Sequence, residues 1–191
     1  MAIKRFTIDG YGQLELNNVA FRRDGRIEAQ SKLDDTDFAT VPAENGMLLA
    51  VDEVNRVVKF DADGSLPIAL NYSSEHMYDE RANGLKNFYL DRNTFLPRLG
   101  YLSIGDSFTT NCIAYDSSEF ADDAALVTAL AKYKETPVYG GVCSNGAIKL
   151  TATKANITYG PIFGCKPSTM PNGSYGVYFV TLGEVVKNST I

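Results

Sequence analysis

One short segment of the sequence carries residue types that could do chemistry, Gly105-Asp106-Ser107-Phe108. A serine hydroxyl has too high a pKa to attack a carbonyl group unaided, so a nucleophilic serine needs a base, normally a positioned histidine. The chain has one histidine, His76, which lies upstream in a polar stretch without an Asp-x-x-His pattern. A hydrolase would therefore require a fold that brings His76 within reach of Ser107.

The segment resembles the nucleophile block of the Gly-Asp-Ser family of esterases and lipases. In that family the block lies near the N-terminus and a terminal Asp-x-x-His supplies the base, whereas here it lies in mid-chain after a strand predicted over residues 99–104. The competing interpretation is structural: Gly105 permits a turn and Asp106 caps backbone amides. We predict the structural role, no catalytic residue and no enzymatic activity.

The acidic residues form no recognisable metal or catalytic site. Asp61-Ala62-Asp63-Gly64 has the alternating carboxylates of a calcium loop, but Lys59 and Leu70 stand where further acidic ligands are required, so an Asp-Gly turn is predicted. Asp34-Asp35 and Asp122-Asp123 are sequence neighbours that point to different faces, so neither can flank a scissile bond. We interpret the first pair as a solvated loop and the second as a helix start.

The cysteines and glycines give no sign of a cofactor either. Cys112, Cys143 and Cys165 have neither Cys-x-x-Cys spacing nor ligand spacing with the histidine, which favours buried free thiols. No phosphate-binding glycine loop is present, and Gly140-Gly141 is interpreted as a bend between strands. The sequence predicts no cofactor and no metal.

Composition excludes several classes of partner. Of the 191 residues, 45% are hydrophobic and 21% are charged, which is typical of a folded globular chain. The formal net charge is -5, and no stretch concentrates Lys and Arg into a stripe that could neutralise phosphates, so nucleic acid is not an expected partner. The N-terminus lacks the apolar run of a signal peptide, and no later run could span a bilayer, so we expect a soluble protein.

Turn residues recur between short segments rich in β-branched and aromatic residues. This pattern predicts a mainly β fold, either a hairpin-rich sheet or a small barrel or sandwich. Hairpins are predicted over residues 19–29 and 47–60, and residues 177–182 form a strand that is apolar on both faces. Further turns and one further core strand are predicted at Asn145-Gly146, Asn172-Gly173 and residues 148–153.

One substantial α-helix is predicted, over residues 118–134. Ser118 can cap it, acidic residues fill its first turn, lysines fill its last turn, and Pro137 prevents continuation. The expected buried stripe consists of Phe120, Ala124, Leu126, Val127, Leu130, Ala131 and Tyr133.

Three segments are expected along the chain. Residues 1–35 form an N-terminal hairpin or arm, because their charge is higher and they contain a turn at Asp24-Gly25. Residues 36–136 form the main β-rich body, including the helix. Residues 137–191 form a small C-terminal β unit packed on that body.

Several segments together resemble small tailed-bacteriophage virion structural proteins, that is, capsid decoration or auxiliary head proteins. They are residues 68–75, 97–111 and 114–116, within a resemblance that covers about residues 40–160. The resemblance implies that Gly105-Asp106-Ser107-Phe108 belongs to a scaffold segment of the form Gly-Asp-x-Phe-Thr-Thr-Asn, whose third position need not be serine.

The resemblance also implies a role: a protein made in the host bacterial cytoplasm that binds major capsid protein subunits and stabilises the assembled head. It would lie on the capsid surface of the virion, and self-association, for example as a trimer, is compatible with the symmetry of a shell. Two alternatives stay open. The first is a receptor- or glycan-binding module of a head fibre or tail that uses Tyr-rich loops, and the second is an esterase that uses Ser107.

Overall fold

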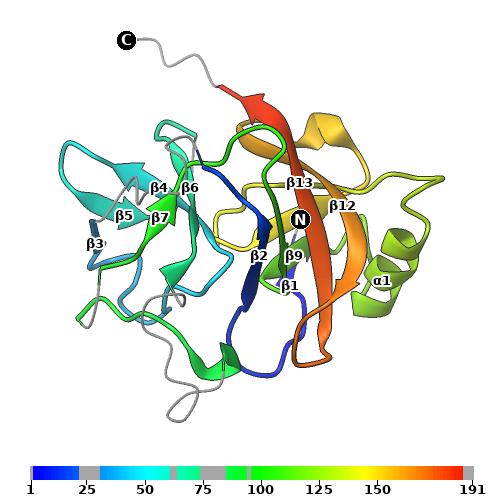
Figure 1. Cartoon of the computed structure of the whole chain (residues 1–191), viewed down its shortest axis with the longest axis horizontal. Helices are drawn as coiled ribbons and strands as arrows, with labels where there is room; N and C mark the ends of the chain where they lie inside the picture. The colour runs from blue at the N-terminus through cyan, green and yellow to red at the C-terminus, as the bar shows by residue number, and fades with distance from the viewer. Residues whose placement is uncertain (1, 22–30, 61–63, 74–84, 94–95, 187–191) are drawn as a thin grey trace.

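The computed structural model describes residues 2–21, 31–60, 64–73, 85–93 and 96–186, and the statements below concern these residues. The fold is mainly β, with two sheets and one α-helix in the described part of the chain (Figure 1). The mainly β class with a helix, predicted from the sequence, is therefore confirmed.

The larger sheet has eight strands, and the N-terminal segment supplies both of its edge strands. All of its strand pairs are antiparallel except β9 with β11, which is parallel. Its order is β1 (Ile3–Arg5), β9 (Ile113–Asp116), β11 (Ile148–Thr151), β10 (Tyr139–Gly141), β12 (Gly160–Thr169), β13 (Tyr175–Val185), β8 (Ser107–Thr110) and β2 (Leu14–Asn18).

The smaller sheet has five strands, of which only β3 and β5 pair in parallel. Its order is β3 (Lys32–Leu33), β5 (Val57–Lys59), β4 (Leu48–Asp52), β6 (Ile68–Asn71) and β7 (Leu99–Gly100). Two short 3₁₀ turns, Leu85–Asn87 and Lys154–Asn156, lie in the connections.

Strand β4 is buried on both faces and joins two hydrophobic clusters. Leu48 and Ala50 pack with Phe108 and the other aromatic residues of the larger sheet, while Leu49 and Val51 face a second cluster. Because successive side chains of a strand point to opposite faces, an unbroken apolar run such as residues 47–51 is what a strand between two cores requires. This strand is the first of the hairpin predicted over residues 47–60.

Three predicted turns are present where the sequence places them. β4 and β5 form a hairpin, and Gly146 and Gly173 have φ of +79° and +82° in the turns between β10 and β11 and between β12 and β13. Glycine adopts this left-handed conformation without steric cost, which explains why Asn-Gly is a reliable local signal. The hairpin predicted over 19–29 falls largely on residues 22–30, outside the described residues.

The helix is shorter than predicted and buries only part of the predicted stripe. α1 runs from Asp123 to Ala131, and the side chain of Asp122, not of Ser118, caps it by accepting from the Ala125 N–H (2.8 Å). Ser118 instead donates its N–H and hydroxyl to the Asp116 carboxylate, which holds a turn before the helix. The buried helix side chains are Leu126 and Leu130, whereas Ala124 and Ala131 of the predicted stripe are exposed.

Two further strand predictions need correction. Residues 177–182 lie in β13, but only Val177, Phe179 and Thr181 point into the core, so the alternate side chains cover the outer face of the sheet. Gly140 and Gly141 are not a bend, because both lie inside β10. A Cβ atom there would lie within 3.0 Å of Phe179 or Ile157, so close packing and not a turn selects glycine.

The three predicted segments all contribute strands to the larger sheet. β1 and β2 from residues 1–35 form its opposite edges, and β3 belongs to the smaller sheet. β12 and β13 from the C-terminal segment lie in the middle of the larger sheet, with β13 paired to β8 from the predicted body (Figure 1). The predicted boundaries at 35 and 136 therefore do not coincide with a boundary between the two sheets.

Candidate functional site

The Gly-Asp-Ser segment forms a turn that leads into β8. The Asp106 N–H donates to the Ser103 carbonyl (3.0 Å), and Gly105 has φ of +94°. A Cβ at Gly105 would meet nothing within 4 Å, so the backbone conformation, and not lack of space, requires glycine. The strand predicted over residues 99–104 is shorter in the structure, where β7 spans Leu99–Gly100 and the turn begins at Ser103.

The carboxylate of Asp106 is used entirely by the backbone around this turn. It accepts hydrogen bonds from the N–H groups of Ala20 (2.9 Å), Phe21 (3.1 Å) and Ser103 (2.8 Å), and the residue is 4% exposed. The acid therefore ties the end of the β2 segment to the turn. The prediction that Asp106 caps backbone amides is confirmed.

Ser107 is the first residue of β8 and lies between two strands. Its backbone is in register with Asn18 of β2 on one side and Val180 of β13 on the other, and the residue is 5% exposed. The described residues provide no hydrogen-bond partner for its hydroxyl. His76 lies outside the described residues.

The positions that follow Ser107 each have a contact that builds the sheet. Phe108 is fully buried and packs against Phe163 and Phe179, with ring centroids 5.5 and 5.4 Å away. The Thr109 hydroxyl donates to Asn17 (2.9 Å), and the Thr110 hydroxyl donates to the Gln13 carbonyl. Asn111 then accepts from the Gln13 N–H through its side-chain oxygen, at 2.7 Å.

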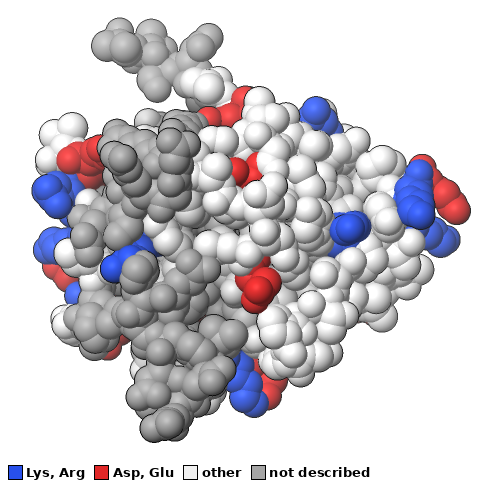
Figure 2. Space-filling model, in the orientation of Figure 1, with Lys and Arg blue, Asp and Glu red and all other residues white. Residues whose placement is uncertain are grey.

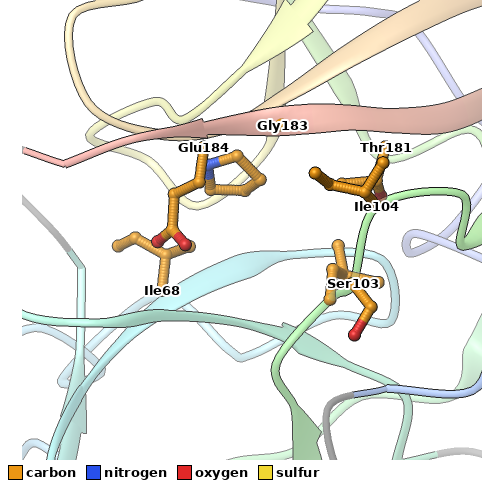
Figure 3. A pocket seen from close by; sticks show the side chains of 8 residues that line it. Ile68, Ser103, Ile104, Thr181, Gly183 and Glu184 are labelled. Carbon is orange, nitrogen blue, oxygen red and sulfur yellow. The ribbon is translucent and has the colours of Figure 1, made fainter.

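A hollow of about 330 Å³ opens beside this turn, at the end of β13 (Figure 3). Two backbone bonds hold the turn to β13: Gly105 N–H donates to the Thr181 carbonyl and Thr181 N–H donates to the Asp106 carbonyl, both at 2.9 Å. Ile104, at the tip of the turn, is 78% exposed. The hollow is lined by Ile68, Leu102, Ser103, Ile104, Pro161, Thr181, Gly183 and Glu184.

A second hollow of about 270 Å³ continues from the first. The two share Ile68 and Glu184, and the second extends along Tyr159 to Val186, which is 74% exposed. In Figure 3 the Glu184 side chain extends from β13 toward Ile68, across the hollow from Ile104. Among the described residues that line the two hollows, Glu184 is the only acidic or basic one. We call the two together the β13-end hollow.

A separate groove of about 500 Å³ lies on the outer face of β12 and β13, beside the end of α1. It contains three tyrosines, Tyr133, Tyr139 and Tyr178, and the Lys166 ammonium lies 4.6 Å from the centre of the Tyr178 ring. Figure 2 shows few charged side chains over β12 and β13 on this face. We call this surface the tyrosine groove.

The described residues contain no group of three His, Cys, Asp or Glu side chains that could hold a metal ion. Asp61 and Asp63 lie outside the described residues. Cys112, Cys143 and Cys165 are buried and unpaired, as predicted. Burial raises the pKa of the Cys112 thiol to about 12, so this sulfur stays protonated and is a poor nucleophile.

A second buried carboxylate, that of Glu44, also serves the fold. It forms an ion pair with Arg5 (2.8 Å) and accepts the Gly12 N–H (2.6 Å) through the same oxygen. Burial disfavours the Arg5 cation, but the negative environment that includes Glu44 outweighs it and raises the pKa of Arg5 above its usual value. This pair links the N-terminal strand to the loop before β4.

Comparison with known protein families, with curated protein sequences and with solved structures finds no match to this chain. In the described part of the chain, no helix has both the length and the apolar character needed to cross a bilayer.

Proposed function

We propose that this protein is a non-enzymatic structural protein of a tailed-phage virion that binds the outer face of the assembled head and stabilises it. One observation carries the proposal. In the segment Gly105 to Asn111, every position except Ser107 has a defined structural contact or conformation. This distribution fits a scaffold segment Gly-Asp-x-Phe-Thr-Thr-Asn better than a nucleophile block, in which the serine is the residue that the fold must present.

The accessible surfaces support a binding role. The β13-end hollow and the tyrosine groove are lined mainly by aliphatic and aromatic side chains, with one carboxylate in the first and one ammonium in the second. Apolar surface of this kind on a folded domain is typical of contact with another macromolecule.

The proposal is tested by mixing the purified protein with phage heads that lack it. We expect saturable binding and an increase in the temperature or denaturant concentration at which the heads break. Heads already saturated with the protein are the control and should take up no more. A protein that neither binds such heads nor raises their resistance would refute the proposal.

A second function, recognition of a glycan, is favoured by the tyrosine groove. Tyrosine offers a large flat contact area at low conformational cost and a hydroxyl at its tip, which suits a sugar ring. The expected result is binding on a glycan array that Tyr178→Ala abolishes. A blank array for the wild type would remove this alternative.

The esterase alternative is tested by measuring hydrolysis of short-chain esters by the wild type and by Ser107→Ala. We expect no activity in either protein. Activity in the wild type that the substitution abolishes would overturn the non-enzymatic assignment.

A further inference from the structure

The tyrosine groove owes its shape to a glycine in the middle of the larger sheet. On the outer face, Gly164 of β12 lies in register with Tyr139 of β10 on one side and with Val180 of β13 on the other. Because glycine has no side chain, a trough is left between these two neighbours. A Cβ at Gly164 would come no closer than 3.4 Å to the Leu182 side chain, so the space above the glycine is open.

The walls of the groove carry polar groups that the fold does not use. Lys166 lies in register with Tyr178, and its ammonium lies 4.6 Å from the centre of the Tyr178 ring. The described residues give this ammonium no carboxylate partner, and they give the hydroxyls of Tyr133, Tyr139 and Tyr178 no hydrogen-bond partner. An ammonium has three N–H donors, and contact with one ring face does not use all of them. An apolar groove with a few polar groups is the usual form of a site for a small ligand.

The floor of the groove cannot take up a peptide as an added strand. At Gly164, β12 is paired with β10 on one side and with β13 on the other, and β13 is paired with β8 along residues 177–180. The backbone groups of the floor are therefore used within the sheet, and a ligand must be recognised by side chains. Tyrosine side chains suit a sugar, because the ring packs against C–H groups and the hydroxyl bonds to the hydroxyls of the sugar.

Lys166 favours a ligand with a negative charge. Among the described residues that line the groove it is the only acidic or basic one, and it is exposed. Its ammonium is held beside the Tyr178 ring, where it can pair with a carboxylate on a sugar that packs against the tyrosines. A cationic ligand would be repelled there, and a neutral sugar would gain no ion pair.

We propose that the tyrosine groove binds a glycan that carries carboxylates, such as one built from uronic acid units. The sugar ring packs against the tyrosine side chains, and a carboxylate accepts a hydrogen bond from Lys166 Nζ. The inference rests on the second function given above, glycan recognition, and does not depend on head binding.

The test measures binding of the full chain to pairs of oligosaccharides that differ only in a carboxylate. The pairs are galacturonic acid with galactose, glucuronic acid with glucose, and mannuronic acid with mannose. In at least one pair we expect the acidic member to bind about tenfold or more tightly than the neutral one, and the preference to shrink as the salt concentration rises.

Three variants assign the effect to residues. Lys166→Met keeps an unbranched side chain but removes the charge, so it should reduce binding of the acidic member to that of the neutral one. Tyr178→Ala should abolish binding of both. The matched control is Lys154→Met, at an exposed lysine of the turn Lys154–Asn156 that does not line the groove, and it should bind like the wild type.

Equal binding of both members of every pair, or an acid preference that survives Lys166→Met, would overturn the role of Lys166 and leave glycan recognition standing. Polyglutamate that binds as tightly as the best acidic sugar, with the same loss in Lys166→Met, would identify an acidic peptide as the ligand and overturn the proposal. If the wild type binds no oligosaccharide, the inference and the glycan alternative both fail. Binding to phage heads is measured separately and is expected to be the same for Lys166→Met and the wild type.

Discussion

Replacement of Asp106 by alanine is the most direct test of the role of the Gly-Asp-Ser segment. The change removes a carboxylate that accepts three backbone N–H groups, at 2.8 to 3.1 Å. The Phe21 N–H is buried and would lose the one acceptor that the described residues give it, while the Ala20 and Ser103 N–H groups are partly buried and can regain some solvation. One fully lost bond to a charged acceptor and two partly replaced ones correspond to a loss of about 3–5 kcal/mol.

This magnitude is a large fraction of the stability of a typical domain, which is about 5–15 kcal/mol. For a chain of this size the melting temperature should fall by roughly 6–20 °C. Equilibrium unfolding in urea should show a lower midpoint with an unchanged slope. Asp106→Asn keeps one acceptor oxygen and the volume of the side chain, so its stability should lie between those of the wild type and Asp106→Ala.

Ser107→Ala is the matched control, since it changes the adjacent residue in the same segment. The described residues give the Ser107 hydroxyl no hydrogen-bond partner, so its removal should change stability by less than about 1 kcal/mol. If the free energy of unfolding of Asp106→Ala lies within about 1 kcal/mol of the wild-type value, which is the size of one hydrogen bond, the capping argument is refuted. The same holds if Ser107→Ala is the less stable of the two.

Three further predictions concern other parts of the fold. Gly140→Ala places a Cβ 2.9 Å from Phe179 and should cost about 1–3 kcal/mol in denaturant unfolding, whereas Gly183→Ala should cost little. Tyr175→Phe removes a buried hydroxyl to which the described residues give no partner, so the substitution should leave stability at neutral pH unchanged or increase it. Burial raises the pKa of Tyr175 from 10.0 to about 12, so the wild type should lose stability between pH 10 and 12, and Tyr175→Phe should lose less. Hydrogen bonds from the Ser118 N–H and hydroxyl hold the pKa of Asp116 below its usual 3.8. The difference in unfolding free energy between the wild type and Asp116→Asn should therefore be constant above about pH 5 and become smaller as the pH falls below 3.8.

Turns and side-chain caps of the backbone could be predicted from the sequence, because a few neighbouring residues determine them. The Asn-Gly turns before β11 and β13 follow from the left-handed conformation of Gly146 and Gly173. The acid cap of the Gly-Asp-Ser turn likewise needs only an aspartate near free backbone amides. The sequence predicts too early a start for α1, because a serine such as Ser118 can cap a helix or take part in a turn. In the structure Ser118 donates to the carboxylate of Asp116, two residues before it, and so belongs to a turn.

The pairing of strands that lie far apart in the chain could not be predicted from the sequence. Residues 177–182 are apolar at every position except Thr181, so their pattern predicts burial on both sides, yet the fold covers only one face of β13. The side left open depends on which strands pair with it, and β8 comes from a segment about seventy residues earlier in the chain. For the same reason neither the parallel pairing of β9 with β11 nor the β13-end hollow leaves a signal in any single stretch of sequence.

The Gly-Asp-Ser segment resembles a nucleophile block because a turn and a catalytic elbow need the same properties. Both require a sharp turn, which glycine allows, and a nucleophile must in addition be exposed. Here Ser107 is 5% exposed and Ile104, three residues earlier, is 78% exposed. The residue that this turn presents to solvent is therefore aliphatic and borders the β13-end hollow, whereas the serine is buried.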